Sequence, residues 1–410
     1  MSVTDRRDGP DAAVTPDARA VPDLRLGVIG LGARAGLGQL ADRPGEGSAV
    51  VAICDPDPVH LDRRRPDFPR ATGYSDHRAL LELGLDAVLV TSPDWTHEDI
   101  AADVLEAGVA LFLEKPIAIT TAGADRLLAI AARTDTPFYV GHNMRHMPVV
   151  TLLRDLIRQG AVGEVKTIWC RHFVGHGGDF YFRDWHADRR LVTGLLLQKA
   201  AHDLDVIHWL AGGYTRRVQA FGDLMVYGQI ADRRGPGEAL MPDWWTLDHW
   251  PPLAQTRLNP VVDVEDVSLV NLVLDNGVLA AYQQCHFTPD YWRNYTVIGT
   301  EGRLENCGDG PGGVIRLWNR RHQGWDLEGD AVFPIADPGG SHAGADPRLI
   351  AEFLDFVRGR ALPTTSPVGA REAVATGCAA TDSLRAGGEL RLVPEPDPAA
   401  VAYFAQRTRP

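Results

Sequence analysis

Short apolar runs alternate with amphipathic stretches along the first third of the chain. The apolar runs have the length of buried strands, and apolar residues recurring every three or four positions predict helices. This alternation predicts an α/β fold with a doubly wound parallel sheet of Rossmann type. Strands are expected at 24–29, 49–54, 86–90, 111–116 and 138–140, with helices ending near 41 and covering 98–107 and 121–133.

The pattern changes in the second half, where strands with alternating polar and apolar residues follow one another. Runs of this kind after an alternating half predict an open, mainly antiparallel sheet. Strands are expected at 164–173, 218–227, 267–274, 278–287, 291–298 and 314–318, and helices at 149–159, 195–210, 347–358 and 368–385.

The length and this change of pattern predict two domains. A chain of 410 residues exceeds the roughly 250 to 300 residues that one hydrophobic core usually supports. We place the domains at 24–146 and 147–410. Residues 1–23, rich in Asp, Arg, Pro and Ala, predict a disordered tail. Residues 228–260, with three Trp among prolines, predict an insertion that is either a lid or an oligomer contact.

Composition excludes several classes of partner. A net charge of −13 argues against nucleic acid or an anionic membrane as the main partner. No apolar run approaches the roughly 18 residues of a membrane span. The five cysteines form no C-x-x-C pair, which favours reduced thiols and a cytoplasmic protein.

A glycine-rich turn directly follows the first strand. Its sequence from Gly30 to Ala35 is G-x-G-x-x-A, in which two glycines allow a tight turn and close approach to a pyrophosphate, and the small third residue lets helix pack on strand. The next strand ends in Asp55, where a carboxylate accepts hydrogen bonds from a ribose diol and repels a 2′-phosphate. The pair predicts NAD, with NADP less favoured. Asp55 could instead cap the helix that follows.

Lys115 closes the stretch L-F-L-E-K-P, a buried strand that ends in a charged pair. Only three of the 41 basic residues are lysines, namely Lys115, Lys166 and Lys199. Ligands of an open parallel sheet lie outside the carboxyl ends of its strands. Lys115 is therefore a candidate for chemistry, although a surface lysine at a strand end is an equal alternative.

The expected helix 195–210 carries a group of polar residues on an otherwise apolar stretch. Gln198, Lys199 and His202 project from one face, where buried polar groups demand partners. A single core histidine would not explain the group, so we interpret it as catalytic. Lys199 should favour the neutral form of His202, because like charges disfavour protonation, and a neutral imidazole can act as a general base.

Four motifs together resemble the Gfo/Idh/MocA oxidoreductases, named for glucose–fructose oxidoreductase and inositol dehydrogenase. They are G-L-G-A-R-A, T-S-P-D-W-T-H at 91–97, E-K-P, and G-H-N-M-R-H-M-P at 141–148. The resemblance implies a Rossmann domain, an α+β domain with an open antiparallel sheet, and hydride transfer between nicotinamide and a hydroxyl carbon of a sugar or cyclitol. It also implies a homodimer or homotetramer formed through the sheet.

The motifs and the resemblance together define the candidate site. The family's helix carries Asp-x-x-x-His, which His202 matches, whereas Gln198 stands at the Asp position. His172, His176 and His186 lie in a glycine-rich loop without the spacing of a metal site, so no metal is expected. The cofactor-binding candidates are Gly30, Gly32, Ala33, Arg34, Asp55, Thr91, Pro93, His97, Glu114 and Lys115; those for substrate are Lys115, Arg145, Gln198 and His202; those for catalysis are Lys115, Lys199 and His202.

Two other functions stay open at this stage. One is a glycosidase that keeps NAD tightly bound and oxidises its substrate only transiently. The other is a dinucleotide-binding regulator without chemistry, for which Gln198 is the only argument.

Overall fold

The computed structural model describes residues 22–235, 237–238 and 246–409. The expected tail, residues 1–23, lies almost wholly outside these ranges. Asp23 is already part of the fold, because its carboxylate accepts the amides of Gly45 at 2.7 Å and Gly47 at 2.8 Å.

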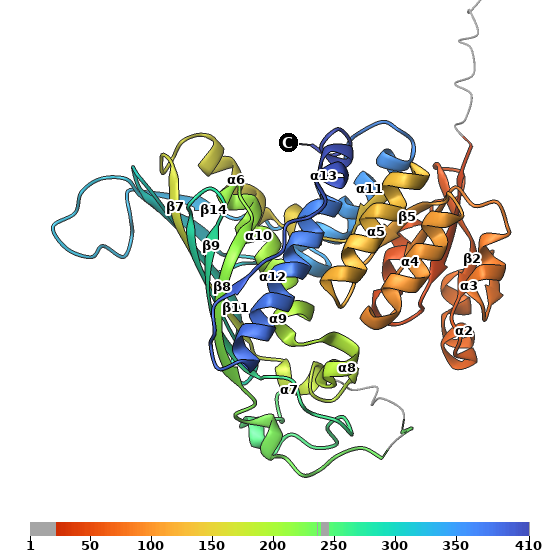
Figure 1. Cartoon of the computed structure of the whole chain (residues 1–410), viewed down its shortest axis with the longest axis horizontal. Coiled ribbons are helices and arrows are strands. Elements are labelled where there is room, and N and C mark those ends of the chain that lie inside the picture. Colours follow the sequence, from red (N-terminus) through yellow and green to blue (C-terminus); the bar gives the residue numbers. More distant parts are fainter. Residues whose placement is uncertain (1–21, 236, 239–245, 410) are drawn as a thin grey trace, which may run out of the picture.

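The first half of the chain folds into a six-stranded parallel sheet, which confirms the doubly wound fold (Figure 1). Its order is β3-β2-β1-β4-β5-β6, so the strand order reverses between β1 and β4. In such sheets ligands bind beyond the strand ends at this reversal. The strands are β1 (Leu24–Ile29), β2 (Ser48–Cys54), β3 (Thr72–Tyr74), β4 (Ala87–Val90), β5 (Ala110–Leu113) and β6 (Phe138–Val140).

Helices cover both faces of this sheet, and three of them come from the end of the chain. Leu349 and Phe353 of α11 share an apolar core with β1, whereas Val374 of α12 and Phe404 of α13 join the core beneath α4 and α5. The last helices therefore complete the first domain. These helices are α1 (Gly36–Ala41), α2 (Pro58–Arg64), α3 (His77–Leu81), α4 (His97–Glu106), α5 (Thr121–Thr134), α11 (Ala345–Val357), α12 (Pro367–Arg385) and α13 (Pro398–Ala405).

The second half contains a nine-stranded mixed sheet in the order β14-β13-β12-β11-β7-β10-β9-β8-β15. Its strands pair antiparallel except for β7 and β10, so the expectation of a mainly antiparallel sheet is confirmed. The strands are β7 (Val165–Val174), β8 (Thr215–Asp223), β9 (Val267–Leu274), β10 (Leu279–Cys285), β11 (Tyr291–Gly299), β12 (Arg303–Cys307), β13 (Val314–Trp318), β14 (Ala331–Pro334) and β15 (Arg391–Leu392).

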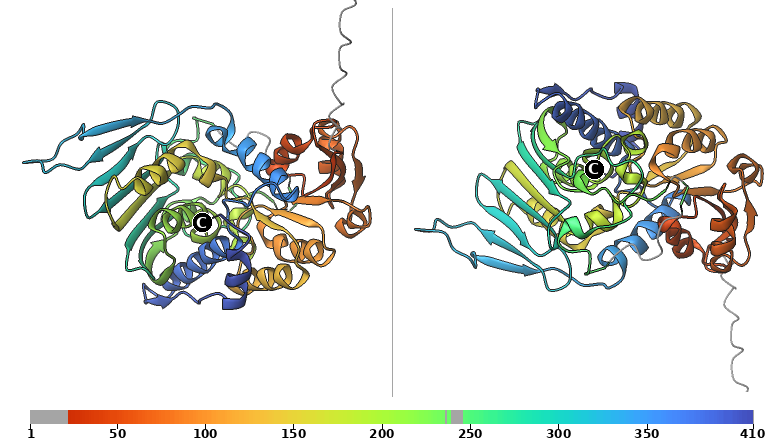
Figure 2. Two further views of the ribbon diagram at one scale, coloured as in Figure 1. Left: turned by 90° about the horizontal axis from the view of Figure 1, so that it is seen from above. Right: turned by 90° about the horizontal axis from the view of Figure 1, so that it is seen from below.

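The two faces of this second sheet differ. Helices α6 (Pro148–Arg158), α10 (Ala201–Ala211) and α12 share a core with its inner face, as Figure 2 shows. The outer face presents large apolar side chains that are about half exposed: Trp169, Phe221, Leu269 and Leu279.

Two elements differ from their predictions. The expected helix 195–210 is two helices, α9 (Leu195–Gln198) and α10, although the intervening Lys199 and Ala200 keep near-helical backbone angles. Apolar periodicity runs through this change of hydrogen bonding and so does not reveal it. The strand expected at 218–227 is β8 and ends at Asp223. The buried carboxylate of Asp266 accepts three successive amides at 225–227 and turns the chain out of the sheet.

The described parts of the expected insertion 228–260 pack on two short helices, α7 (Gly177–Phe180) and α8 (Arg189–Val192), and their loops. Arg234 donates to the carbonyl of Arg183 at 2.9 Å, and Gln255 to the carboxylate of Asp179 at 3.0 Å. Trp244 and Trp245 lie outside the described residues, so a role as lid or contact stays a prediction. In the described part of the chain, no helix is long and apolar enough to cross a membrane. The cytoplasmic location also stays a prediction.

Candidate active site

The glycine-rich turn follows β1 at the point where the strand order reverses. Gly30 has φ 90°, and a Cβ there would lie 2.4 Å from the backbone of Ser92, so only glycine fits. A Cβ on Gly32 would meet no atom within 4 Å. The first glycine thus packs against the β4 end, and the second leaves space for a phosphate to approach, as a dinucleotide requires.

The ends of β2 and β4 hold this turn in place. The buried carboxylate of Asp55 accepts the amide of Leu31 at 2.8 Å and that of Asp57 at 2.9 Å. Thr91 Oγ1 donates to the carbonyl of Gly30 at 2.6 Å. Each carboxylate oxygen can accept a further bond, so these contacts leave Asp55 able to bind a ribose diol.

Arg34 and Glu114 tie the turn to the lysine strand and to α11. Arg34 Nε donates to Glu114 at 2.7 Å, and its Nη1 and Nη2 donate to Asp346 at 2.9 and 3.1 Å. Glu114 also accepts the backbone amide of Lys115 at 2.9 Å. Burial opposes ionisation of Glu114, but the charges of Arg34 and Lys115 outweigh it and lower its pKa. The side chain of Arg34 is thus already bonded within the protein. A cofactor could use the backbone amides of Arg34 and of the exposed Ala33 beside it.

His97 supports the loops around the site. Its Nδ1 lies 2.7 Å from the carbonyl of Pro116 and its Nε2 lies 2.8 Å from that of Ser92. Both ring nitrogens are engaged with backbone, so the ring has no further polar atom for a cofactor. The nearby carbonyl of Pro93 accepts the amide of Thr96 at 2.9 Å and shapes the same loop.

Lys115 reaches from the end of β5 across to the second half of the chain. Its Nζ donates to the backbone carbonyl of Gln198 at 3.1 Å. Because α9 ends at Gln198, this carbonyl belongs to a helix end, where helical partners are missing. Burial lowers the pKa of Lys115, and the charges of Asp94 and Glu114 partly offset this effect.

His202 lies in the first turn of α10 and is 9 % exposed. Among the described residues its Nδ1 has no hydrogen-bond partner. Burial lowers its pKa well below the ordinary value, and the charges of Lys115 and Lys199 lower it further. Lys199 thus acts in the predicted direction, and these effects favour the neutral imidazole that a general base needs.

Gln198 faces Asp94, a residue that the sequence interpretation missed. The Gln198 side chain lies beside the Asp94 carboxyl and favours its ionised form. Gln198 Oε1 and Asp94 Oδ2 are buried and have no partner in the part of the chain described. Burial raises the pKa of Asp94 to about 7, against the opposing charge of Lys115. Its position within T-S-P-D-W-T-H, at the end of β4, was the available signal.

Asp203 and Arg293 form a second buried group that the sequence interpretation missed. Arg293 Nε lies 3.0 Å from Asp203 Oδ1, and the same carboxylate accepts the hydroxyl of Tyr282 at 3.2 Å. His172 Nδ1 lies 3.1 Å from it, and the hydroxyl of Tyr295 also donates to it. The alternation of residues 291, 293 and 295 along one strand face could have indicated this group.

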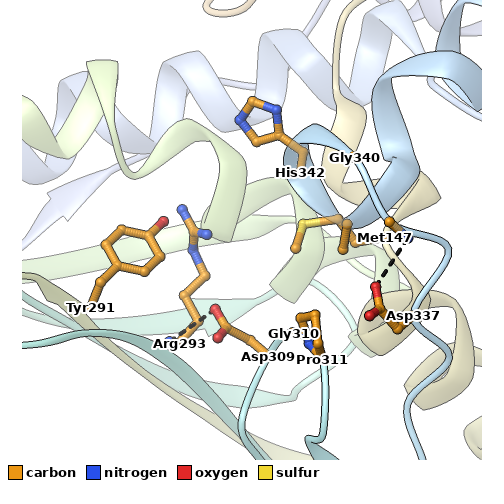
Figure 3. Close-up of a pocket in the computed structure, with 11 residues that line it drawn as sticks. Met147, Tyr291, Arg293, Asp309, Gly310, Pro311, Asp337, Gly340 and His342 are labelled. Carbon is orange, nitrogen blue, oxygen red and sulfur yellow. Dashed lines mark hydrogen bonds between the residues drawn. The ribbon is translucent and has the colours of Figure 1, made fainter.

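A cavity of about 390 Å³ opens beside Arg293 (Figure 3). In the close-up the Arg293 guanidinium extends beside the Tyr291 ring and away from Asp309. The ammonium of Lys199 lies over the ring of Tyr291 at 5.7 Å and over that of Tyr181 at 5.4 Å. The cavity itself is lined by Tyr291, Arg293 and Asp309 together with Met147, Gly310, Pro311, Asp337, Gly339, Gly340, His342 and Ala343.

Two family models together match most of the chain. Residues 24–142 match the oxidoreductase family with an NAD-binding Rossmann fold, and residues 150–305 match the GFO/IDH/MocA C-terminal domain. The chain belongs to the Gfo/Idh/MocA family.

Members of the Gfo/Idh/MocA family with assigned names match only part of the chain. Inositol 2-dehydrogenase of Corynebacterium glutamicum is 29% identical over 193 residues, 46% of this chain and 54% of that protein. Putative oxidoreductase YteT of Bacillus subtilis is 25% identical over 256 residues, 54% of this chain and 60% of that protein. The chain thus spans little more than half the length of these relatives.

Solved structures of similar fold cover the chain more fully. Levoglucosan dehydrogenase in complex with NADH superposes with a TM-score of 0.72 over 91% of this chain and 100% of that one, at 17% identity. A myo-inositol 2-dehydrogenase from Lactobacillus plantarum gives 0.67 over 91% and 100%, at 18% identity. At these identities the likeness is one of fold.

In this Gfo/Idh/MocA chain, the candidate Arg145 has its guanidinium bonded to protein groups. Two of its nitrogens donate to Asp205, each at 2.7 Å, and the third donates to the carbonyl of Thr364 at 2.7 Å. Its guanidinium is thereby engaged on all sides, so a direct role in binding substrate stays a prediction without support from this geometry. Among the described residues, no group of three or more His, Cys, Asp or Glu is placed to hold a metal ion.

Proposed function

We propose that this protein is an NAD-dependent dehydrogenase that transfers hydride between nicotinamide and a secondary hydroxyl carbon of a sugar, glycoside or cyclitol. The observation that carries the proposal is that the Lys115 ammonium, beyond the end of β5, bonds at 3.1 Å to the carbonyl of Gln198, four residues before His202. Burial and this charge lower the pKa of His202 and so favour the neutral imidazole. Buried polar atoms of Gln198, Asp94 and His202 that have no partner among the described residues support the proposal, because buried polar groups normally have partners.

Each residue has a distinct role in the proposed reaction. The bound nicotinamide supplies the acceptor for the hydride. Lys115 donates a hydrogen bond to the substrate oxygen as it takes on alkoxide character, and its anchor on the Gln198 carbonyl orients the ammonium. His202 accepts the hydroxyl proton, so that the alcohol becomes a ketone. The amide of Gln198 cannot take this proton over from His202, as a carboxylate could. We therefore propose that the proton leaves through the carboxyl of Asp94, which is buried beside Gln198.

The proposed preference for NAD rests on Asp55. Its carboxylate is held at the glycine-rich turn by the Leu31 and Asp57 amides, where it would face the ribose. The like charge of a 2′-phosphate would be repelled there.

We also propose a homodimer or homotetramer formed through the outer face of the second sheet. Trp169, Phe221, Leu269 and Leu279 leave this face with large exposed apolar groups, and contiguous apolar surface of this kind is unusual on a monomer. Light scattering at micromolar concentration should give a multiple of the chain mass; a monomer would contradict this assembly.

A panel of sugars, sugar acids and cyclitols, assayed for NADH formation, tests the function. Stoichiometric NADH with at least one polyol is expected, because a dehydrogenase releases its reduced cofactor. Product formed from a glycoside without net NADH would instead identify a glycosidase with retained NAD. Tight NAD binding with no turnover of any substrate would favour a regulator.

A further inference from the structure

We propose that Lys199, Arg293 and Tyr291 form a subsite for an anionic group on the substrate, a carboxylate or another oxyanion, beside the hydroxyl that reacts. The inference rests on the proposed function and narrows its substrate class to acidic sugars or cyclitols.

Lys199 is a half-buried basic residue for which the described part of the chain offers no counter-ion. Its ammonium lies over the rings of Tyr181 and Tyr291, and none of the described carboxylates forms an ion pair with it. Ring faces attract a cation but do not accept three strong hydrogen bonds, which is what an ammonium offers. Burial and the charges of Arg293 and Lys115 lower the pKa of Lys199. A buried charge is normally paired, so an anionic acceptor beside the amine would favour its charged form and complete the arrangement.

Arg293 adds a second cation around the same ring. Its guanidinium lies 5.6 Å from the centre of the Tyr291 ring, on the cavity side that Figure 3 shows. Among the described residues, the carboxylate paired with it is Asp203, which already accepts bonds from His172, Tyr282 and Tyr295. One shared carboxylate balances Arg293 and leaves nothing for Lys199.

The neighbouring acids do not remove the excess of positive charge. Glu114 is bonded to Arg34 at 2.7 Å, and Asp94 has its pKa raised to about 7 by burial, so it is only partly ionised at neutral pH. Lys115 adds a third cation, and the oxidised nicotinamide ring would add a fourth. An anion of the substrate would balance this charge where Lys199 and Arg293 meet.

The rest of the cavity restricts where the anion can lie. Asp309 accepts the backbone amide of Arg293 at 3.2 Å, and Asp337 accepts that of Gly339 at 3.0 Å. These acids would repel an anion on their side, so the anionic group belongs at the Tyr291 and Lys199 side and the hydroxyls face the acids. The cavity volume of about 390 Å³ lies within the usual range for small-molecule sites.

The test compares matched substrates in the wild type and in Lys199→Gln. We measure kcat/KM with NAD for D-glucuronate and D-glucose, and for glucose 6-phosphate to distinguish a carboxylate from a phosphate. The ratio of kcat/KM for D-glucuronate to kcat/KM for D-glucose should fall about 100-fold in Lys199→Gln. This is the scale of a lost charge-assisted hydrogen bond. The control Lys166→Gln removes an exposed lysine paired with Glu164 and should leave the ratio unchanged.

A milder variant and a binding measurement keep the test decisive. Tyr291→Phe keeps the ring and removes the hydroxyl, so it reports on the subsite if Lys199→Gln does not fold. Its ratio of kcat/KM values for the two sugars should fall about tenfold.

Calorimetric binding of D-glucuronate and D-glucose to the enzyme with NADH needs no turnover. Binding of D-glucuronate that Lys199→Gln weakens, without any turnover, would support the subsite and contradict the dehydrogenase. An unchanged ratio, turnover of neutral sugars alone, or no binding of any acidic sugar would overturn the subsite.

Discussion

Buried polar groups have hydrogen-bond partners at the glycine-rich turn, whereas several in the region around Lys115 and His202 have none among the described residues. At the turn, Asp55 and Thr91 bond to the backbone of the turn itself and of the loop after β2, so the frame is complete before a cofactor binds. Around Lys115, atoms of Gln198, His202 and Asp94 are buried without partners among the described residues. The first region is a preformed frame, whereas the second has polar atoms that a substrate would complete.

The region around Lys115 and His202 also differs from the glycine-rich turn in its electrostatics. Burial lowers the pKa values of Lys115 and His202 and raises that of Asp94, so burial favours the neutral form of each of these groups. Shifts of this kind in one place are typical of acid–base sites. The contrast predicts that substitutions there change rates, whereas those at the turn change cofactor affinity.

The largest effect is expected for His202→Ala. Loss of the proton acceptor should lower kcat by about 10² to 10⁴-fold, the usual contribution of general acid–base catalysis. NAD affinity, measured by titration, should barely change. The control His208→Gln alters a histidine of the same helix that is bonded to Thr215, and it should lower stability without lowering kcat. Full activity of His202→Ala would place the chemistry elsewhere.

Lys115→Ala should follow, with kcat lower by about 10² to 10³-fold, as when one donor to a developing oxyanion is removed. Lys115→Arg should not restore the rate, because a planar guanidinium cannot replace a compact ammonium on the Gln198 carbonyl. Steady-state kinetics measure both variants. Recovery of the rate in Lys115→Arg would show that only the charge matters.

Asp55→Asn should weaken the use of NAD without lowering the rate at saturating NAD. The kcat/KM for NAD should fall about tenfold and the preference over NADP should narrow, because the ribose loses a charged acceptor. The value of kcat at saturating NAD should change little. Asp57→Asn, which alters a neighbouring acid that caps α2 through the Val59 amide, is the matched control. Equal efficiency of the two cofactors in the wild type would refute the role of Asp55.

Gln198→Asp should give the smallest and most specific effect, a shift in the pH profile. Oxidation needs neutral His202, whose pKa lies well below its ordinary value, so protonation of His202 limits the wild-type rate only at low pH. A carboxylate at 198 favours the imidazolium and raises that pKa, so the rate should begin to fall at a higher pH. Gln198→Ala removes the amide without adding charge and should not produce this upward shift. An identical profile in Gln198→Asp would mean that residue 198 does not contact His202.

The local sequence alone predicted the frame of the first domain. Strands β1, β2 and β6 follow from short apolar runs, and the turn between Gly30 and Ala35 follows from its glycines. The positions of Asp55 and Lys115 follow from the same patterns, because a residue at the end of a buried parallel strand has only one edge of the sheet to occupy. These properties depend on neighbours in the chain, which periodicity and turn chemistry record.

Only the tertiary structure decided which distant groups meet. The pairing of Asp203 with Arg293 joins residues 90 positions apart, and it depends on how β11 aligns with β7 and how α10 packs on the sheet. The anchor of Lys115 on Gln198 depends on the end of α9, which apolar periodicity does not show. The engagement of Arg145 by Asp205 and the return of α11 to the first domain have the same origin. Packing and register are properties of the whole chain, so no local pattern contains them.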